Sequence, residues 1–210
     1  LSIRRQRQMC IRDRATGTST FSNNASIVNI ENIKAHASGG TINLSGQSEG
    51  FTIVGNTSDD IITGGDGNDI ISGGGGNDTF KITSGTDIIS DINTLDVFIV
   101  STGATMNATG VSTFSATNAS SNSGTATLTT VSTGGTINMS SVGGSGGFTL
   151  IGSEKNDSLT GSGNNDILEI KSTGAGDGDT LDGAGGTDTL KLSTGTHTPV
   201  SYTHLTLPTN

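Results

Sequence analysis

Aspartates recur at a fixed interval in the first half of the chain, and they could bind a metal ion. They lie nine residues apart, at Asp60, Asp69, Asp78, Asp87 and Asp96. Two positions after each lies a large apolar residue, in a register that starts two steps earlier: Leu44, Ile53, Ile62, Ile71, Phe80, Ile89 and Phe98. Carboxylates are hard oxygen ligands, which Ca²⁺ prefers, whereas a zinc site uses mainly thiolate and imidazole ligands.

A second, less regular series follows in the other half of the chain. Its members are Asp157, Asp166, Asp179 and Asp188, with Leu159, Leu168, Leu181 and Leu190 as apolar partners. The middle step spans 13 residues instead of nine. We expect the four additional residues to bulge out as a loop.

Glycine-rich turns precede the aspartates. The best copies are GGDGND at residues 64–69 and GGGGND at 73–78, with looser copies at 174–179 and 183–188. The pattern is G-G-x-G-x-D-x-U-x, and it resembles the RTX, or haemolysin-type, calcium-binding nonapeptide repeat. The resemblance is strong at 64–81, good at 152–168 and 174–192, and weak at 55–63 and 82–99. Residues 15–50 and 100–147 fall outside it.

Each nonapeptide predicts half of a solenoid coil. Six glycine-rich residues turn, and the following triplet forms a short strand with its middle side chain facing inward. Two halves make an 18-residue coil, so we expect Asp60 to stack on Asp78, and Asp69 on Asp87. The predicted fold is therefore all-β, a parallel β-roll or β-solenoid in two tandem units.

Stacked carboxylates repel one another, at a cost of about 1 kcal/mol per pair in water-like surroundings and roughly 3 to 4 at a protein surface. A cation between the coils removes that cost. Since one buried apolar side chain per nonapeptide does not offset the ordering of nine residues, we expect calcium binding to be coupled to folding.

The family resemblance implies the ligands. In RTX proteins, turn carbonyls and the sixth-position aspartate of consecutive coils hold calcium ions. Carried onto this chain, the metal ligands are Asp60, Asp69, Asp78, Asp87, Asp157, Asp166, Asp179 and Asp188, with Gly65, Gly67, Gly74 and Gly76 in the two best turns. Asp60, Asp96 and Asp157 follow turns with at most one glycine, so the end sites should be incomplete. The alternative is that these aspartates merely cap the turns.

Composition argues against an ordinary globular enzyme. The chain has 33 glycines, 30% hydrophobic residues and 3% aromatic residues among 210, too little bulk for a conventional core. Two G-x-S-x-G matches begin at Gly46 and Gly143, but neither lies in the strand–elbow–helix context of a hydrolase. The middle of the chain is strongly acidic and lacks aromatic platforms, which disfavours nucleic acid. No apolar window approaches the length of a membrane span.

Segments 39–70 and 134–167 align after a two-residue insertion, which indicates a tandem repeat of about 95 residues. We predict repeat unit 1 at 15–110, with an RTX-like block at 51–99, and repeat unit 2 at 111–198, with a block at 148–192. Residues 1–14 and 199–210 resemble sequencing-adapter read-through and are predicted to be non-native tails. The basic start could instead be a nucleic-acid or targeting arm. The flanking segments should be metal-free solenoid coils or sandwich strands, or else loose linkers.

These features predict a calcium-stabilised structural region of a secreted or cell-surface bacterial protein, such as an adhesin or S-layer-like protein, rather than an enzyme. Calcium is the expected ligand, and cell-surface or self-assembly partners are possible. The resemblance implies type I secretion from a Gram-negative cell. The alternative is the C-terminal calcium-binding module of a type I secreted protease, lipase or toxin.

Overall fold

The computed structural model describes residues 30–35, 39–171 and 178–193, together with the backbone of three short strands at 9–10, 18–20 and 201–203. The described residues form strands, turns and bends, and none of them lies in a helix. Accordingly, no helix capable of crossing a membrane occurs among them. Residues 172–177, most of 15–29 and most of the two predicted tails lie outside the described residues, although the short strands at 9–10 and 201–203 fall within the tail ranges.

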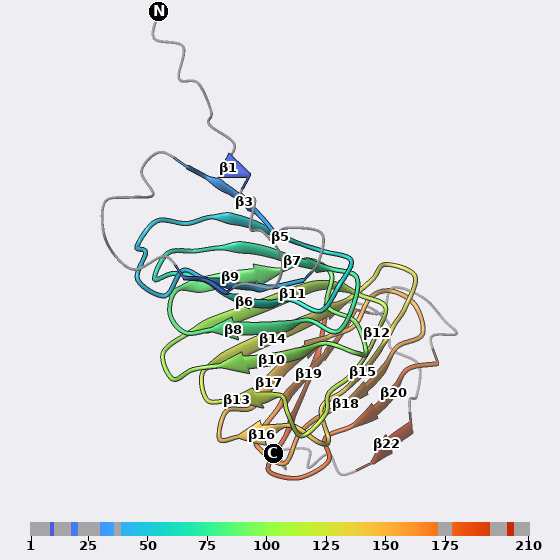
Figure 1. The fold of residues 1–210 in the computed structure, drawn as a ribbon. Coiled ribbons are helices and arrows are strands. Elements are labelled where there is room, and N and C mark those ends of the chain that lie inside the picture. Colours follow the sequence, from blue (N-terminus) through green and yellow to red (C-terminus); the bar gives the residue numbers. More distant parts are fainter. Residues whose placement is uncertain are drawn as a thin grey trace, which may run out of the picture.

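The chain coils around a common interior that is enclosed by three parallel β-sheets (Figure 1). Sheet A, with ten strands, comprises β1 (Met9–Cys10), β3 (Asn32–Lys34), β5 (Thr52–Asn56), β7 (Ile70–Gly74), β9 (Thr86–Ile89), β11 (Thr105–Val111), β14 (Thr125–Thr130), β17 (Phe148–Ile151), β19 (Ile167–Ile170) and β21 (Thr189–Leu192). Sheet B comprises β2 (Thr18–Thr20), β4 (Thr41–Asn43), β6 (Ile61–Thr63), β8 (Thr79–Ile82), β10 (Val97–Val100), β13 (Ser121–Asn122) and β16 (Gly143–Gly144). Sheet C comprises β12 (Thr113–Ser115), β15 (Thr136–Asn138), β18 (Ser158–Thr160), β20 (Thr180–Asp182) and β22 (Ser201–Thr203).

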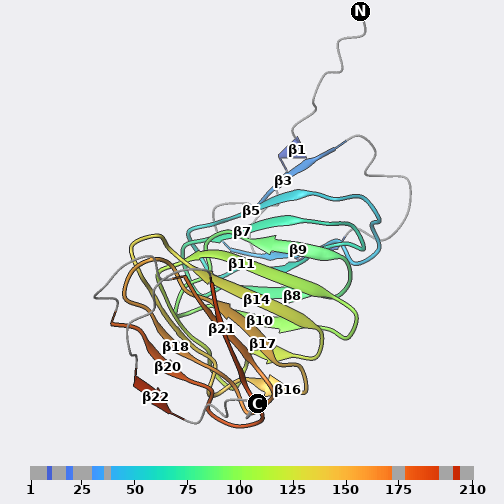
Figure 2. The same ribbon diagram turned by 180° about the vertical axis from the view of Figure 1, so that it is seen from behind.

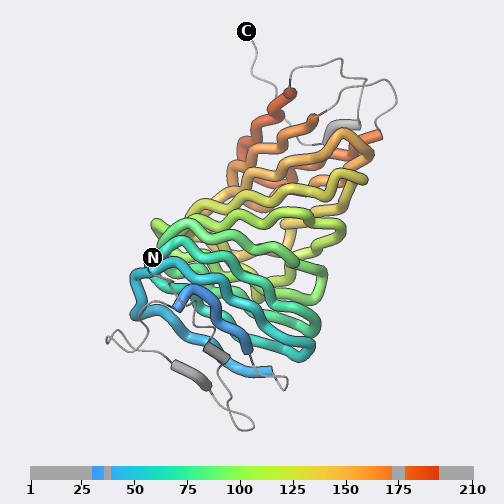
Figure 3. The backbone as a smooth tube through the Cα atoms, turned by 90° about the horizontal axis from the view of Figure 1, so that it is seen from above, coloured from blue at the N-terminus to red at the C-terminus, as the bar shows by residue number. Residues whose placement is uncertain are grey.

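The order of the strands along the chain shows a β-solenoid. The sheet that alternates with sheet A, called here the second wall, changes from sheet B to sheet C along the molecule. Up to β10 the chain alternates between sheets A and B, so each coil has two strands. From β11 to β16 each coil passes through A, C and B in turn. From β17 onward it alternates between A and C. Figure 2 shows sheet A running along the whole molecule from behind, and Figure 3 shows the coils stacked along it.

The inward rows of the three sheets form one continuous core. Ile53, Ile71, Ile89, Ala108, Leu128, Leu150 and Leu168 are register partners along sheet A and are all buried. The apolar series predicted from the nine-residue spacing is confirmed, because all seven residues from Leu44 to Phe98 are fully buried. In the second series Leu159, Leu168 and Leu181 are buried, whereas Leu190 is only partly so.

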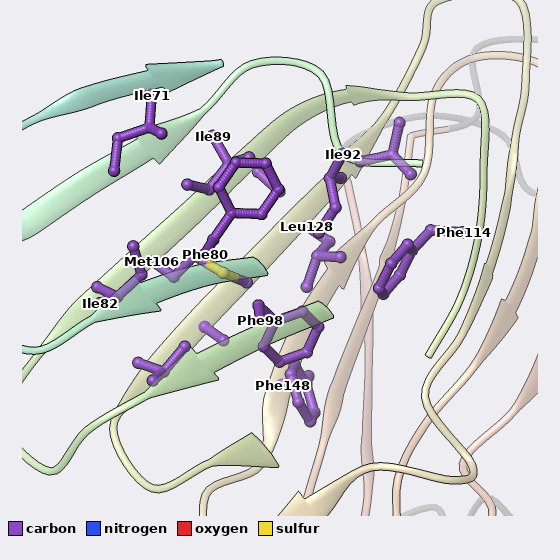
Figure 4. Packing of buried hydrophobic residues seen from close by; sticks show 14 of the residues in the cluster. Ile71, Phe80, Ile82, Ile89, Ile92, Phe98, Met106, Phe114, Leu128 and Phe148 are labelled. Carbon is purple, nitrogen blue, oxygen red and sulfur yellow. The ribbon is translucent and has the colours of Figure 1, made fainter. Parts of the chain in front are cut away.

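Aromatic side chains fill the interior where sheet C replaces sheet B. Phe98 of β10 packs against Phe114 of β12 and Phe148 of β17, with ring centroids 5.8 and 5.9 Å apart (Figure 4). Each of the three rings comes from a different sheet. A three-walled coil encloses a wider space than a flattened two-walled one, and these rings occupy it. Residues 39–50 and 100–147 belong to solenoid coils continuous with the two blocks. Of the alternatives predicted for the flanking segments, the solenoid coils are therefore found, and not sandwich strands or loose linkers.

Candidate metal centre

Every aspartate of the two periodic series is buried at a turn between strands. The relative exposure of these nine residues is at most 4%. A buried carboxylate is unfavourable unless it accepts hydrogen bonds or meets a cation. The surroundings of these nine side chains therefore decide what the turns can bind.

One carboxylate oxygen of each aspartate accepts an amide from the preceding coil. In five cases the donor is the amide of the stacked aspartate, at 2.8–2.9 Å, in the pairs Asp60 to Asp78, Asp69 to Asp87, Asp78 to Asp96, Asp157 to Asp179 and Asp166 to Asp188. For the first two aspartates of each series the donors are the amides of Gly40, Phe51, Gly135 and Phe148, at 2.6–2.8 Å. The structure thus brings the predicted stacks together. The last two pairs span 22 residues, so the four additional residues leave the register intact, although the predicted loop at 172–177 lies outside the described residues.

The second oxygen folds back over the aspartate's own turn. In the turn before Asp69 the Gly65 amide donates to Oδ2 at 2.8 Å, and in the turn before Asp166 the Ser162 amide does the same. This position leaves no room for a side chain at the start of the turn. A Cβ built on Gly64 would lie 2.4 Å from Asp69 Oδ2, and this explains why glycine opens the motif.

Among the residues that the structure describes, three buried carboxylate oxygens have no hydrogen-bond partner. They are Oδ2 of Asp78, Asp87 and Asp188. For Asp78 and Asp188, the amide four residues earlier is taken by another carboxylate: Gly74 donates to Asp91, and Ala184 donates to Asp182. A buried anionic oxygen that accepts no hydrogen bond is unfavourable, and each of these three oxygens could be a ligand for a cation.

Burial also shifts the titration of these groups. Desolvation, reinforced by the charges of Asp96, Asp60 and Asp91, raises the pKa of Asp78 to about 6. Desolvation and the charge of Asp69 raise the pKa of Asp87 to about 7. Burial likewise raises the pKa of a further set of stacked carboxyls, namely Asp60, Asp69, Asp96 and Asp166. The turns therefore disfavour negative charge in the absence of a cation.

The glycines predicted as carbonyl ligands lie where neighbouring coils touch. A Cβ on Gly65 or Gly67 would meet Gln47 O or Glu49 O within 2.5 Å. Gly74 and Gly76 have φ of 95° and 108°, a conformation that side-chain-bearing residues rarely adopt. The four glycines thus let coils stack closely, and the metal-binding role of their carbonyls stays a prediction.

A second set of hydrogen bonds between coils, formed by the residue before four of the aspartates, was not expected from the sequence. The side-chain oxygens of Asp59, Asn68, Asn156 and Asn165 accept amides of the following coil at 2.8–3.0 Å. Each of these four residues, with the aspartate that follows it, therefore ties its coil to both neighbours. The recurrence of ND was the available signal, since three of the four precede an aspartate as asparagine. Asp91 lies outside the nine-residue series of aspartates and was also missed.

The donor set fits calcium. The available atoms are carboxylate and main-chain oxygens in turns, which favour Ca²⁺ over the strict octahedron of Mg²⁺. Among the described residues no three acidic, histidine or cysteine side chains converge into one cluster. A cation in these turns would therefore need main-chain carbonyls beside the carboxylates.

Comparison with known families supports this assignment. Residues 52–80 and 142–169 match the RTX calcium-binding nonapeptide repeat (4 copies). The first matched segment covers the turns at 64–69 and 73–78, and the second covers Asp157 and Asp166 but not the turns at 174–179 and 183–188. Searches of curated proteins and of solved structures found no match to the chain.

Proposed function

The chain carries RTX nonapeptide repeats, which bind calcium ions, and from this premise we propose that it is a calcium-stabilised structural region of a secreted or cell-surface bacterial protein of the adhesin or S-layer type. RTX repeats occur in proteins that Gram-negative bacteria export by type I secretion. The medium outside the cell supplies the calcium. Folding there would convert a charged, glycine-rich chain into a stiff solenoid.

One observation carries the proposal: carboxylates from successive coils stack in the interior, and three of their oxygens are buried without a partner. A divalent cation removes both the repulsion within the stack and the cost of the bare oxygens. The proposed ligands are the carboxylates of Asp60, Asp69, Asp78, Asp87, Asp157, Asp166, Asp179 and Asp188, with the carbonyls of Gly65, Gly67, Gly74 and Gly76.

The tandem arrangement favours a scaffold role. The two similar segments, 39–70 and 134–167, are parts of one continuous solenoid that shares sheet A. Repetition of one structural unit along an axis extends a molecule without adding a catalytic cavity. Open reading frames on either side of the coding sequence distinguish the contexts: further copies of the 95-residue unit support a surface scaffold, and a catalytic motif upstream supports a secreted enzyme.

Circular dichroism tests calcium-coupled folding directly. The full chain, freed of metal, is titrated with CaCl₂, and MgCl₂ serves as the matched control. We expect β-sheet signal to increase with calcium in the millimolar range and to increase far less with magnesium. Identical far-UV spectra in EDTA and in millimolar calcium would contradict the proposal.

A further inference from the structure

Asp91 lies outside the nine-residue register, in the segment between β9 and β10, yet it accepts more hydrogen bonds than most periodic aspartates. Its Oδ2 accepts the Ser72 hydroxyl at 2.5 Å and the Gly74 amide at 2.8 Å, and its Oδ1 accepts the Gly73 amide at 3.0 Å. All three donors belong to the neighbouring coil, 17 to 19 residues earlier. Asp91 therefore reaches back over the turn that ends at Asp78.

This contact changes the hydrogen bonding of Asp78. In the equivalent turn one half-coil earlier, the Gly65 amide donates to Oδ2 of Asp69. The corresponding donor for Asp78 is the Gly74 amide, and Asp91 takes it. Asp78 is 1% exposed, so its Oδ2 is left bare in the interior. The amides of this turn therefore donate to Asp91, and no donor remains for Oδ2 of Asp78.

The two carboxylates converge on Gly73. A Cβ built on Gly73 would lie 2.1 Å from Asp78 Oδ2, while the amide of the same residue donates to Asp91. Asp60 and Asp96 flank Asp78 in the stack and add further negative charge. Within the described part of the chain the recorded ion pair, Lys191 with Glu169, lies on other strands and brings no cation here. Asp91 is half-buried, which gives an ion a route from solvent.

We propose that Asp78 and Asp91 together hold one hard divalent cation, Ca²⁺ in a calcium-rich medium, at the end of the first block. Asp91 supplies a ligand that the nonapeptide pattern does not contain. The bare Oδ2 of Asp78 supplies the second, and main-chain carbonyls of the turn complete the oxygen shell. This inference rests on the proposed calcium-binding function and adds Asp91 to the ligands of the site at Asp78.

Native mass spectrometry of the full chain in calcium tests the site by counting bound ions. Asp91→Asn keeps one oxygen that can accept the Gly73 amide but removes the charge, and we expect this variant to bind one ion fewer than the wild type. Asp66→Asn, which removes an exposed carboxylate from the preceding turn, is the matched control and should bind the wild-type number.

An Asp91→Asn chain that binds the wild-type number of ions overturns the inference, because Asp91 would then be only a cap on the turn. If the variant fails to become β-rich in calcium, Asp91→Glu replaces it: we expect an unchanged ion count with weakened binding of one ion, and unchanged affinity at every site overturns the inference. A wild type that binds no calcium at all refutes the proposed function instead, so the two failures are distinguishable.

Discussion

Oδ1 of Asp78 accepts the main-chain amide of Asp60 at 2.9 Å, although the two residues are 18 positions apart. Each stacked aspartate therefore binds its neighbour through the backbone and opposes it through charge. The hydrogen bond fixes the separation of successive carboxylates, so the repulsion cannot be relieved by movement of the side chain. Only neutralisation, by a cation or a proton, relieves it.

Protons should partly replace calcium in this stack. The folded-state pKa of Asp78 is about 6 and that of Asp87 about 7, both above the value near 3.9 for an unfolded aspartate. Between about pH 4 and pH 7 the folded chain therefore binds more protons than the unfolded chain. Its stability is highest below about pH 4 and is lost as the pH rises through 6 to 7. In metal-free buffer we expect more β-sheet signal by circular dichroism at pH 5 than at pH 8.

Calcium should reverse this trend, because its ligands must be deprotonated. At saturating calcium we expect stability against urea to be greater at pH 8 than at pH 5. A metal-free chain whose β-sheet signal grows from pH 5 to pH 8 would show that the stacked carboxyls do not govern folding.

A glycine of these turns should be needed for stability only where the aspartate that ends the turn packs its carboxylate against it. A Cβ at Gly161 would lie 2.6 Å from both Asp166 Oδ2 and the Gly183 carbonyl, whereas nothing lies within 4 Å of a Cβ at Gly163 in the same turn. We expect Gly161→Ala to lower the free energy of unfolding in calcium by about 1 to 3 kcal/mol or more, as overpacking does. Gly163→Ala should change it by less than about 1 kcal/mol. Urea unfolding of both variants measures this, and equal effects would contradict the proposed geometry.

The nine-residue spacing was enough to predict the half-coils, the inward apolar row and the stacking of Asp60 on Asp78. It could not predict the change from sheet B to sheet C. The string GGTIN occurs at residues 39–43 and 134–138, yet Thr41–Asn43 joins sheet B and Thr136–Asn138 joins sheet C. A short strand specifies its own inward side chain but not the wall it joins, because that depends on the intervening coils and on how their aromatic side chains pack.

The same limit applies to the candidate site. Periodicity identified the aspartates on the stack, because every step within the two series except that from Asp166 to Asp179 is nine residues. It could not identify Asp91, whose role depends on a side chain reaching across 17 residues to the Gly74 amide. Contacts between coils are visible only once the register is known in three dimensions.

The carboxylate of Asp69 should stabilise the fold through its hydrogen bonds in addition to any bound ion. It accepts the Phe51 amide at 2.7 Å and the Gly65 amide at 2.8 Å, and Asp69→Ala would leave both donors without a partner. Each unsatisfied buried donor costs about 1–3 kcal/mol. We expect a loss of about 2 to 6 kcal/mol in thermal or urea unfolding with calcium present. Asp66→Ala, at an exposed position of the same turn, should stay within about 0.5 kcal/mol of wild type.

The aromatic junction should stabilise the molecule independently of the ion. Phe98 is fully buried between Phe114 and Phe148, at the point where the second wall changes from sheet B to sheet C. Phe98→Ala removes contacts with both rings and leaves a cavity, for an expected loss of about 3–5 kcal/mol in urea unfolding. Leu95, 63% exposed in the preceding turn, provides the control, and Leu95→Ala should have little effect. Because the change touches no carboxylate, the number of calcium ions bound to the folded variant should match the wild type. A variant that lost ions but kept its stability would show instead that the junction serves the metal sites and not the core.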